Sequence, residues 1–334
     1  MRVLALTFGD EHTASTKFRI IQYRTEFARQ GILCDVKAAK GFRDFAILPS
    51  YDVVLLQKTL VSGRFFSKLR RGARRLIYDA DDLIWLAPGK KHSFMTRLRT
   101  ERRLRRIARA ADLCLAANGV IAADLALRGG RTTVIPMALD GKIWQDSAKD
   151  SGLVVGWSGA PNNLVFLRAI LPQLREVQSR FPEVQWLFHC GEDPLFLNFK
   201  YTHVPFESGL EHEVVRCFHV GLLPLPDDPF VRGKSPIKAL QYFACRVAVI
   251  GSPVGATREI ILDEENALWV RETDQWGKAL GRLLSDPELR QRLAAAGRQA
   301  FEEHYDLPRV AGRLIEALAG SVLSADSQVT EREN

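Results

Sequence analysis

The stretch Arg232–Gly255, RGKSPIKALQYFACRVAVIGSPVG, combines a predicted helix, a short buried strand and a glycine turn. Pro236 is favoured at the first position of a helix, and the apolar run after it predicts that a helix begins there. VAVIGS then forms a buried strand, and Gly255 opens the next helix. Such a unit is typical of an open α/β sheet.

Three cations, Arg232, Lys234 and Lys238, lie within seven residues beside the start of this helix. A helix N-terminus carries about half a positive charge and free N–H groups, so it can bind phosphate. With Lys234 and Lys238 beside it, this one could hold a diphosphate without a metal ion. A solvated helix end is the alternative explanation, and the composition leaves both open.

The rest of the chain alternates strands and helices in two similar series. The first contains the strands MRVLALTF, ILCDVK, DVVLLQK, RLIYDA and DLCLAA, and the second begins at LVVGW after the polar linker SAKDSG at 147–152. We therefore predict two doubly wound parallel-sheet domains, at 1–150 and 151–320, followed by a polar tail at 321–334. Ligands of such sheets bind beyond the carboxyl ends of the strands, so the site is expected in the cleft between the domains.

Length and composition fit this organisation. The chain has 334 residues, 46% of them hydrophobic, and no run approaches the roughly 18–20 apolar residues of a membrane-spanning helix. The N-terminus resembles a first strand rather than a signal peptide. Five cysteines without CxxC spacing predict reduced thiols and no zinc site. We therefore expect a cytoplasmic protein.

The net charge of +8 is concentrated in residues 64–109, which hold fifteen Lys or Arg against four Asp or Glu. A helix over 93–111 would carry Phe94, Leu98, Leu104, Ile107 and Ala108 on one side and Arg99, Arg102, Arg103, Arg106 and Arg109 on the other. Such a face suits a membrane surface with anionic lipids, a phosphorylated acceptor or nucleic acid, and a solvated face is the alternative. Nucleic acid is disfavoured because no exposed aromatics are interleaved with the cations.

Two further segments of the second series follow strands and could contact a ligand. In VVGWSG, Gly156 and Gly159 would let the backbone approach a ligand closely, and Ser158 could donate a hydrogen bond, although a plain structural turn is equally compatible. In SPVGATREI, Glu259 would lie in the first turn after Gly255, where it could contact a ligand or complement the helix dipole.

Together these segments resemble the family 4 glycosyltransferases, which are retaining enzymes of the GT-B fold, over nearly the whole chain. The most specific match is GKSPIKALQYFACRVAVIGSPVGATREII, and further matches are FRIIQYRTEFARQGI, RLIYDADDLIW, VIPMALD, VVGWSG, HVGLLPLPDD, ENALWV and LLSDPELRQRLAAAGRQ. The resemblance implies transfer of a sugar from a UDP- or GDP-linked donor to a glycan or lipid-linked acceptor. It also implies a role in the synthesis of surface polysaccharide, lipopolysaccharide or glycoconjugates. The basic residues at 64–109 add the expectation of a peripheral position on the inner face of the plasma membrane.

The resemblance also assigns residues to the donor. Lys234 and Lys238 would be the catalytic cations on the diphosphate, and no metal is expected because GT-B enzymes usually neutralise the diphosphate with protein cations. Many family members have two glutamates separated by seven residues here, whereas this chain has Gly233 and Gln241. The predicted donor-binding residues are Gly156, Trp157, Ser158, Gly159, His189, Arg232, Gln241, Gly255 and Glu259.

Polar residues that end strands of the first series should line the other wall of the cleft. His12, Lys17 and Arg19 follow the first strand; Arg19 is predicted to be catalytic by contacting the donor phosphate, and His12 and Lys17 to bind the acceptor. Asp79, Asp81 and Asp82 could bind acceptor hydroxyls or cap the next segment. A polar surface loop is the alternative for His12, Lys17 and Arg19, and a metal bound by the Asp-x-Asp spacing is disfavoured.

Two other functions remain compatible with the sequence. A nucleotide-sugar epimerase of the same fold would need no acceptor. A degenerate module of this fold would bind glycan or nucleic acid without turnover, which Gly233, Gln241 and the basic charge would favour.

Overall fold

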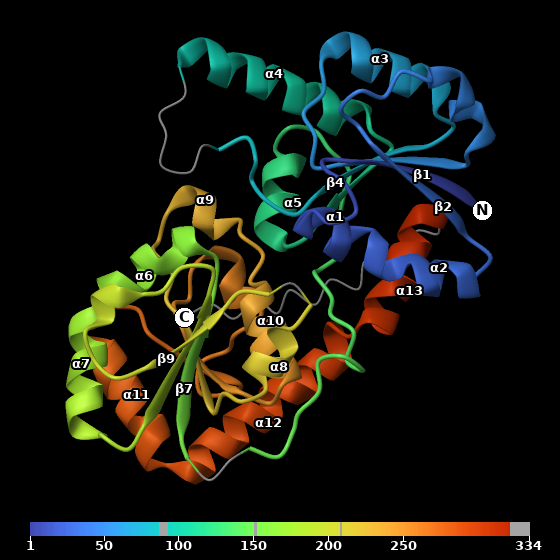
Figure 1. Cartoon of the computed structure of the whole chain (residues 1–334). Coiled ribbons are helices and arrows are strands. Elements are labelled where there is room, and N and C mark those ends of the chain that lie inside the picture. Colours follow the sequence, from blue (N-terminus) through green and yellow to red (C-terminus); the bar gives the residue numbers. More distant parts are fainter. Residues whose placement is uncertain (87–92, 150–151, 208, 321–334) are drawn as a thin grey trace.

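The computed structural model describes residues 1–86, 93–149, 152–207 and 209–320, which form two α/β units (Figure 1). The sheet of the first unit has the order β2-β1-β3-β4-β5-β6, and every pair of neighbours is parallel. Its strands are β1 (Arg2–Thr7), β2 (Leu33–Ala38), β3 (Val53–Gln57), β4 (Leu76–Ala80), β5 (Leu113–Ala116) and β6 (Thr132–Val134).

The sheet of the second unit is also parallel throughout, with the order β12-β11-β10-β7-β8-β9. Its strands are β7 (Val154–Ser158), β8 (Gln185–Cys190), β9 (Thr202–Pro205), β10 (Val220–Leu223), β11 (Ala248–Gly251) and β12 (Ala267–Trp269). The predicted pair of doubly wound parallel sheets is therefore confirmed.

Helices connect the strands of both sheets. The first unit contains α1 (Ala14–Arg19), α2 (Arg24–Arg29), α3 (Gly63–Gly72), α4 (Phe94–Ala110) and α5 (Gly119–Ala126), with 3-10 turns at Ile21–Tyr23 and Phe45–Ser50. The remaining helices are α6 (Leu164–Ala169), α7 (Leu171–Arg180), α8 (Glu211–Val215), α9 (Pro229–Arg232), α10 (Ile237–Ala244), α11 (Gln275–Ser285), α12 (Pro287–His304) and α13 (Leu307–Ala319). Further 3-10 turns lie at Pro161–Asn163, Leu195–Leu197 and Gly255–Glu259.

The stretch Arg232–Gly255 folds largely as predicted. Pro236 is the N-cap of α10, and the residues from Ala239 to the end of this helix are all buried. The strand β11 follows. Gly255 has a φ of 50°, and a β-carbon at this position would collide with the backbone of Arg232. Gly255 opens a 3-10 turn instead of the predicted helix.

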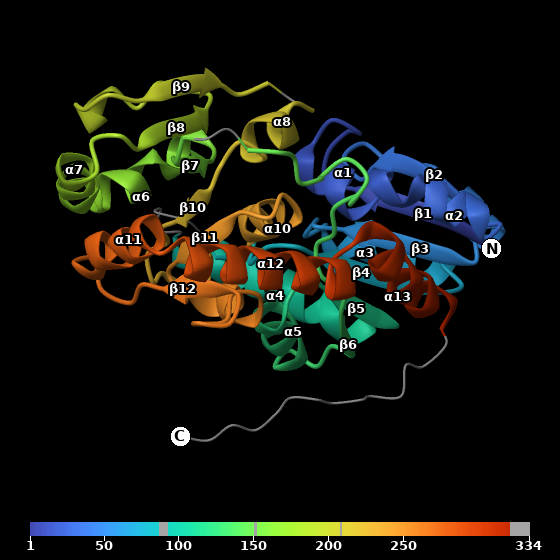
Figure 2. The same ribbon diagram turned by 90° about the horizontal axis from the view of Figure 1, so that it is seen from below.

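The chain crosses between the units twice, and the two crossings lie together. Leu139 on the first crossing accepts a hydrogen bond from the backbone of Leu307 (2.9 Å) and donates one to Tyr305 (3.2 Å) on the second. Figure 2 shows α12 on the second unit leading into α13, which lies against the first unit. Leu314 and Leu318 of α13 join the core of the first sheet.

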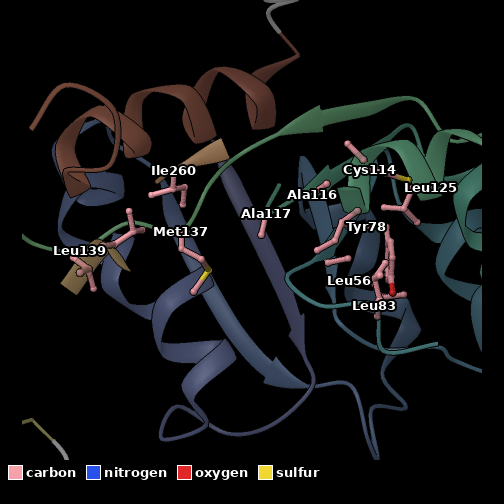
Figure 3. Packing of buried hydrophobic residues seen from close by; sticks show 14 of the residues in the cluster. Leu56, Tyr78, Leu83, Cys114, Ala116, Ala117, Leu125, Met137, Leu139 and Ile260 are labelled. Carbon is pink, nitrogen blue, oxygen red and sulfur yellow. The ribbon is translucent and has the colours of Figure 1, made fainter. Parts of the chain in front are cut away.

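The domain division at 1–150 and 151–320 stays a prediction. It separates the strands of the two sheets, but α13 belongs to the second range in sequence and packs against the first sheet. The predicted tail at 321–334 and part of the predicted linker lie outside the described residues. A second hydrophobic cluster extends across both units, and Figure 3 shows Met137, Leu139 and Ile260 within it. In the part of the chain that the structure describes, no helix is both long and apolar enough to span a bilayer.

Candidate active site

A cavity of about 370 Å³ lies between the two units. Its wall on the first unit includes Ala14, Ser15, Phe18, Asp81 and Asp82. Its wall on the second unit includes Trp157, Ser158, Asn163, Leu223, Pro224, Lys234, Ser235 and Lys238.

The sheet topology explains where this cavity forms. The strand order changes direction between β1 and β3 in the first sheet and between β7 and β10 in the second. Connections leave such a switch point toward opposite faces of the sheet, which opens a crevice at the carboxyl ends of the strands. Ser158 ends β7 and Leu223 ends β10, and both line the cavity. The cavity therefore joins the switch points of two sheets.

Lys238 lies in the first turn of α10 and points at the end of β7. Its Nζ donates to Ser158 Oγ (3.0 Å), and Ser158 Oγ lies 3.0 Å from Nδ1 of His189. Burial lowers the pKa of His189, and the charge of Lys238 lowers it further, so the imidazole is neutral at pH 7. A neutral ring can accept at Nδ1, which lets Ser158 donate to it while accepting from Lys238.

Lys234 lies on the loop before α10 and completes a pair of cations in the cavity. Its Nζ donates to Oδ1 of Asn163 (3.4 Å). Burial lowers the pKa of Lys234, and burial lowers the pKa of Lys238 to about 8. Among the described residues, neither ammonium group has a carboxylate within 4.0 Å. The second unit thus presents two half-buried, unpaired cations to the cavity.

The opposite wall carries a compact ionic cluster around Lys58. Its Nζ lies 2.6 Å from Asp82 and 3.0 Å from Asp81, and it also donates to Ser15 Oγ (2.9 Å). Lys58 has a φ of 50°, a conformation that costs a residue with a β-carbon about 1–3 kcal/mol. Burial raises the pKa of Asp82, and the charge of Lys58 opposes that shift. The cluster places two carboxylates opposite the two lysines of the second unit.

The loop from Gly233 to Pro236 is fixed to the first unit. Ser235 Oγ donates to the carbonyl oxygen of Asp81 (3.1 Å), and Asn118 Nδ2 donates to the carbonyl oxygen of Gly233 (3.1 Å). A β-carbon on Gly233 would collide with the side chain of Leu83. The position of Lys234 therefore depends on both units.

The structure places Arg19 and Asp79 away from the cavity. Arg19 is 3% exposed; its Nε donates to Asp79 (3.2 Å) and its Nη1 donates to the carbonyl oxygen of Ile135 (2.6 Å). These contacts occupy the guanidinium within the core and tie α1 to β4 and to the first crossing. The predicted catalytic role of Arg19 and the predicted acceptor contact of Asp79 are not supported by this geometry.

Several predicted donor contacts also lie outside the cavity wall. Gly156 accommodates the ring of Phe218, and Gly159 accommodates the indole of Trp157, so both glycines serve packing. Glu259 accepts from the backbone N–H of Gly119 (3.0 Å), at the N-terminus of α5.

Arg232 is exposed and pairs with Asp227 (2.6 Å). Gln241 is buried, and within the described residues its Oε1 has no hydrogen-bond partner. Neither side chain is part of the cavity wall.

The loop after β1 contributes to the cavity through residues other than those predicted. His12 is exposed, and Lys17 lies over the ring of its neighbour Phe18, 5.8 Å from the centroid. Ala14, Ser15 and Phe18 line the cavity instead. Within the described ranges, no three side chains of the metal-binding types form a cluster, and Asp79 and Asp81 pair with cations.

The predicted basic helix forms as α4, with Leu104, Ile107 and Ala108 buried. Phe94 was expected on the buried side but is 76% exposed, because it is the first residue of the helix and lies beyond the core. Arg99, Arg102, Arg106 and Arg109 are exposed, and Arg103 donates to the carbonyl oxygen of Leu60 (3.3 Å). Figure 1 shows α4 and α3 along the top of the first unit.

The sequence analysis missed Lys58, Ser15, Asn118 and Ser235. Lys58 could have been found, because it is a cation that directly follows a buried strand at the expected edge of the sheet. Asn118 and Ser235 act through contacts between residues more than a hundred positions apart, which no local pattern predicts.

Comparisons with known proteins agree with this geometry. Residues 231–300 match the family model of Glycosyl transferases group 1. No curated protein matches the sequence. The fold is similar to HepE (Alr3699) of Anabaena in complex with UDP, with a TM-score of 0.72 and 15% identity over 96% of this chain and 100% of that chain.

Two other solved structures show the same likeness. Sucrose-phosphate synthase from Thermosynechococcus elongatus has a TM-score of 0.71 and 17% identity over 96% of this chain and 99% of that chain. The lipopolysaccharide outer core galactosyltransferase WaaB has a TM-score of 0.68 and 15% identity over 96% of this chain and 100% of that chain. These structures define the class by its fold, which is GT-B. The family match, which includes α10 and β11, and this fold are both consistent with the predicted resemblance to glycosyltransferases of group 1.

Proposed function

We propose that this chain is a retaining glycosyltransferase that moves a sugar from a nucleoside diphosphate donor to a glycan or lipid-linked acceptor. The observation that carries the proposal is the pair of unpaired cations, Lys234 and Lys238, beside Ser158 in the cavity. A diphosphate would supply the negative charge that these half-buried ammonium groups lack. HepE, which has the same fold, was solved with UDP and with UDP-glucose, and this favours a UDP-linked donor.

The reaction requires that the bond between the anomeric carbon and the phosphate oxygen breaks. The departing diphosphate keeps the electron pair, the acceptor oxygen bonds to the anomeric carbon, and the acceptor proton passes to the leaving phosphate on the same face of the sugar. Negative charge therefore grows on the diphosphate, where Lys234, Lys238 and Ser158 would stabilise it. Fixed donors that face developing charge supply a large part of catalysis in such sites. We propose that no metal takes part.

Asp81 and Asp82 are the candidates for binding acceptor hydroxyls. They lie in the wall of the cavity that faces the two lysines, and both pair with Lys58. A carboxylate can accept hydrogen bonds from two sugar hydroxyls at once. Family and fold do not distinguish among glycans, and the likeness to WaaB favours lipopolysaccharide or another surface glycan as the acceptor.

A nucleotide-binding screen tests the donor site. We expect one of UDP, GDP, ADP, TDP and CMP to bind in a calorimetric titration and to raise the melting temperature. The variant K234A/K238A should lose that binding, whereas the control K200A, a substitution at an exposed lysine of the second unit, should keep it. If no nucleotide binds the wild-type protein, the lysines form a solvated helix end, and the alternative of a degenerate binding module is favoured.

The epimerase alternative differs in its products. An epimerase would interconvert nucleotide sugars in the absence of any acceptor, whereas a transferase would release free nucleoside diphosphate in proportion to the sugar transferred. Chromatography of a donor incubated with and without glycan acceptors distinguishes the two. Interconversion without release of nucleoside diphosphate would refute the transferase proposal.

We further propose that the exposed arginines of α4 bring the protein to a membrane surface with anionic lipids, where a lipid-linked acceptor would lie. Each Lys or Arg near such a surface contributes about 1 kcal/mol. Flotation with vesicles containing anionic lipids should recover the wild-type protein but not R99E/R102E/R109E, and neutral vesicles should recover neither. Equal recovery with both kinds of vesicle would refute the membrane proposal.

A further inference from the structure

A second hollow lies on the first unit beside the cavity. This groove has a volume of about 630 Å³ and is formed by the segments that follow β2, β1 and β3. Phe8, Lys40, Arg43, Thr59, Val61 and Phe65 line it. None of these residues belongs to the donor site or to the predicted acceptor contacts.

The floor of the groove is apolar. Phe8 directly follows β1 and is 57% exposed, although burial of an aromatic side chain of this size is favourable. Phe65 is half-buried and packs edge-on against Phe45, with ring centroids 5.1 Å apart. An exposed aromatic side chain next to packed aromatic rings forms an apolar surface on which an apolar ligand can bind.

The rim of the groove is cationic. Lys40 and Arg43 are exposed, and within the described part of the chain neither has a carboxylate within 4.0 Å. To the described residues, Arg43 makes one side-chain hydrogen bond, which it donates to the carbonyl oxygen of Phe42 (2.9 Å), so its other donors are available to a ligand. The groove thus combines an apolar floor with two unpaired cations, which complements a ligand with an apolar chain and an anionic head.

The groove and the cavity are lined by neighbouring residues of the same loops. Lys58 contacts Ser15, Asp81 and Asp82 in the cavity, and the next residue, Thr59, lines the groove. Phe8 lines the groove, and Ala14, six residues later on the same loop, lines the cavity. A molecule in the groove could therefore extend over Lys58 and Thr59 to reach the donor.

The other end of the groove adjoins the basic helix. Val61 and Ser62 line the groove, and the same loop is held by α4, because Arg103 donates to the carbonyl oxygen of Leu60 (3.3 Å). Arg106 of α4 lies against Gly63. The exposed arginines of α4, the groove and the cavity consequently follow one another across the first unit.

We propose that this groove binds the acceptor and that the acceptor is a glycan carried on a lipid phosphate. Its alkyl or polyprenyl chain would lie on Phe8, Val61 and Phe65 and its phosphate between Lys40 and Arg43, with the glycan hydroxyls extending to Asp81 and Asp82. This proposal rests on the proposed function, which supplies the sugar on the other side of Lys58. It names the chemical class of the acceptor, which the donor site does not determine. That class is an anionic amphiphile from a membrane.

The test uses decyl phosphate as the probe, below its micellar concentration, with the full chain in calorimetric titrations. Decyl maltoside has the same chain without the charge, and inorganic phosphate has the charge without the chain. We expect decyl phosphate to bind at least about tenfold more tightly than either, since both parts of the groove are then used. K40E/R43E should weaken binding by about tenfold or more, and F8S should weaken it several-fold.

Two controls separate the groove from the basic surface. K200E changes an exposed lysine of the second unit, and R102E/R109E changes α4 without changing the groove; both should bind decyl phosphate as the wild type does. The proposal is overturned if decyl phosphate does not bind, if K40E/R43E binds it equally, if decyl maltoside binds as tightly, or if R102E/R109E alone abolishes binding.

Nucleotide titrations of the same variants keep the two proposals distinct. K40E/R43E and F8S should bind nucleotide with unchanged affinity. Nucleotide binding without decyl phosphate binding would refute the groove proposal alone. Absence of nucleotide binding in the wild type would refute the proposed function, and the decyl phosphate comparison would still decide whether the groove binds an anionic amphiphile.

Discussion

The ammonium nitrogen of Lys238 lies 3.0 Å from the hydroxyl oxygen of Ser158, so the first turn of α10 is joined to the end of β7. A cation in the first turn of a helix is unfavourable, because the macrodipole already places positive charge there. Burial adds to this cost and lowers the pKa of Lys238 to about 8. Both effects would be relieved by an anion in the cavity, so this contact is the position at which we propose that phosphate binds.

We expect Lys238→Ala to lower kcat/KM for sugar transfer by about 10²–10³, because it removes a fixed donor facing the charge that develops on the leaving group. Ser158→Ala should have a smaller effect, since the hydroxyl contributes a neutral hydrogen bond. Steady-state kinetics with saturating acceptor measure both. Lys142→Ala, at an exposed lysine outside the cavity, is the control. Unchanged activity of Lys238→Ala would show that the lysine does not contact the donor.

Nucleotide affinity should depend on pH in the alkaline range. Burial sets the pKa of Lys238 at about 8 in the free protein, and a bound diphosphate favours the charged form and raises that pKa. Affinity should therefore be full below pH 7 and fall by up to about tenfold per pH unit above 8, until the pKa of the bound state is reached. Calorimetry from pH 6.5 to 9.5 at constant ionic strength measures this.

Lys238→Arg provides the matched control, since arginine keeps its charge throughout this range. Its affinity should vary less with pH than that of the wild type, and the remaining dependence should come from Lys234, whose pKa burial also lowers. The same slope in both proteins would show that Lys238 is not the titrating group.

The fold could be predicted from the sequence because the central strands are short apolar runs, and β3 and β10 are buried along their whole length. The edge strands β6 and β9 are less apolar and gave no such signal. Helix boundaries were harder to predict where the chain turns sharply. The pattern FRIIQYRTEFARQG predicts one helix, but the chain forms α1, a 3-10 turn and α2 there, because Tyr23 packs into the core from a break in the helix.

The site was predicted in part, and the reason is physical. Lys234, Ser158 and Lys238 follow local rules for strand ends and helix starts, and all three line the cavity. Arg19 and Lys58 both follow strands of the first unit. The sequence does not show which of these cations pairs with a carboxylate in the core and which pairs with carboxylates in the cavity. Asp79 pairs with Arg19 in the core, and this leaves Lys58 to pair with Asp81 and Asp82 in the cavity.

Disruption of the Arg19–Asp79 pair should affect stability more than binding. Both side chains are at most 3% exposed, so Asp79→Ala leaves a buried cation without its partner. We expect a loss of about 3–5 kcal/mol in the free energy of unfolding, measured by urea denaturation. Glu26→Ala, which breaks an exposed pair with Arg29, should cost less than about 1 kcal/mol. Similar losses for the two variants would contradict the structural role of Arg19.

Gly233 should not tolerate a side chain, because it lies in close contact with Leu83. Many members of the family that this chain resembles have a glutamate at this position. In this structure, a β-carbon on Gly233 of the second unit would collide with Leu83 of the first unit. We expect Gly233→Glu to lower the free energy of unfolding by about 1–3 kcal/mol and to weaken nucleotide binding, because the collision displaces the loop that holds Lys234.

A double-mutant cycle with Leu83→Ala tests this cause. Leu83→Ala alone should cost about 2–5 kcal/mol, since it removes a buried side chain. If the collision is the cause, the double variant should be more stable than the sum of the single changes predicts, by about 0.5–3 kcal/mol. Nucleotide affinity should recover in parallel, because Ser235 and Asn118 can then hold the loop in place. Strict additivity would mean that the glutamate acts through its charge and not through its contact with Leu83.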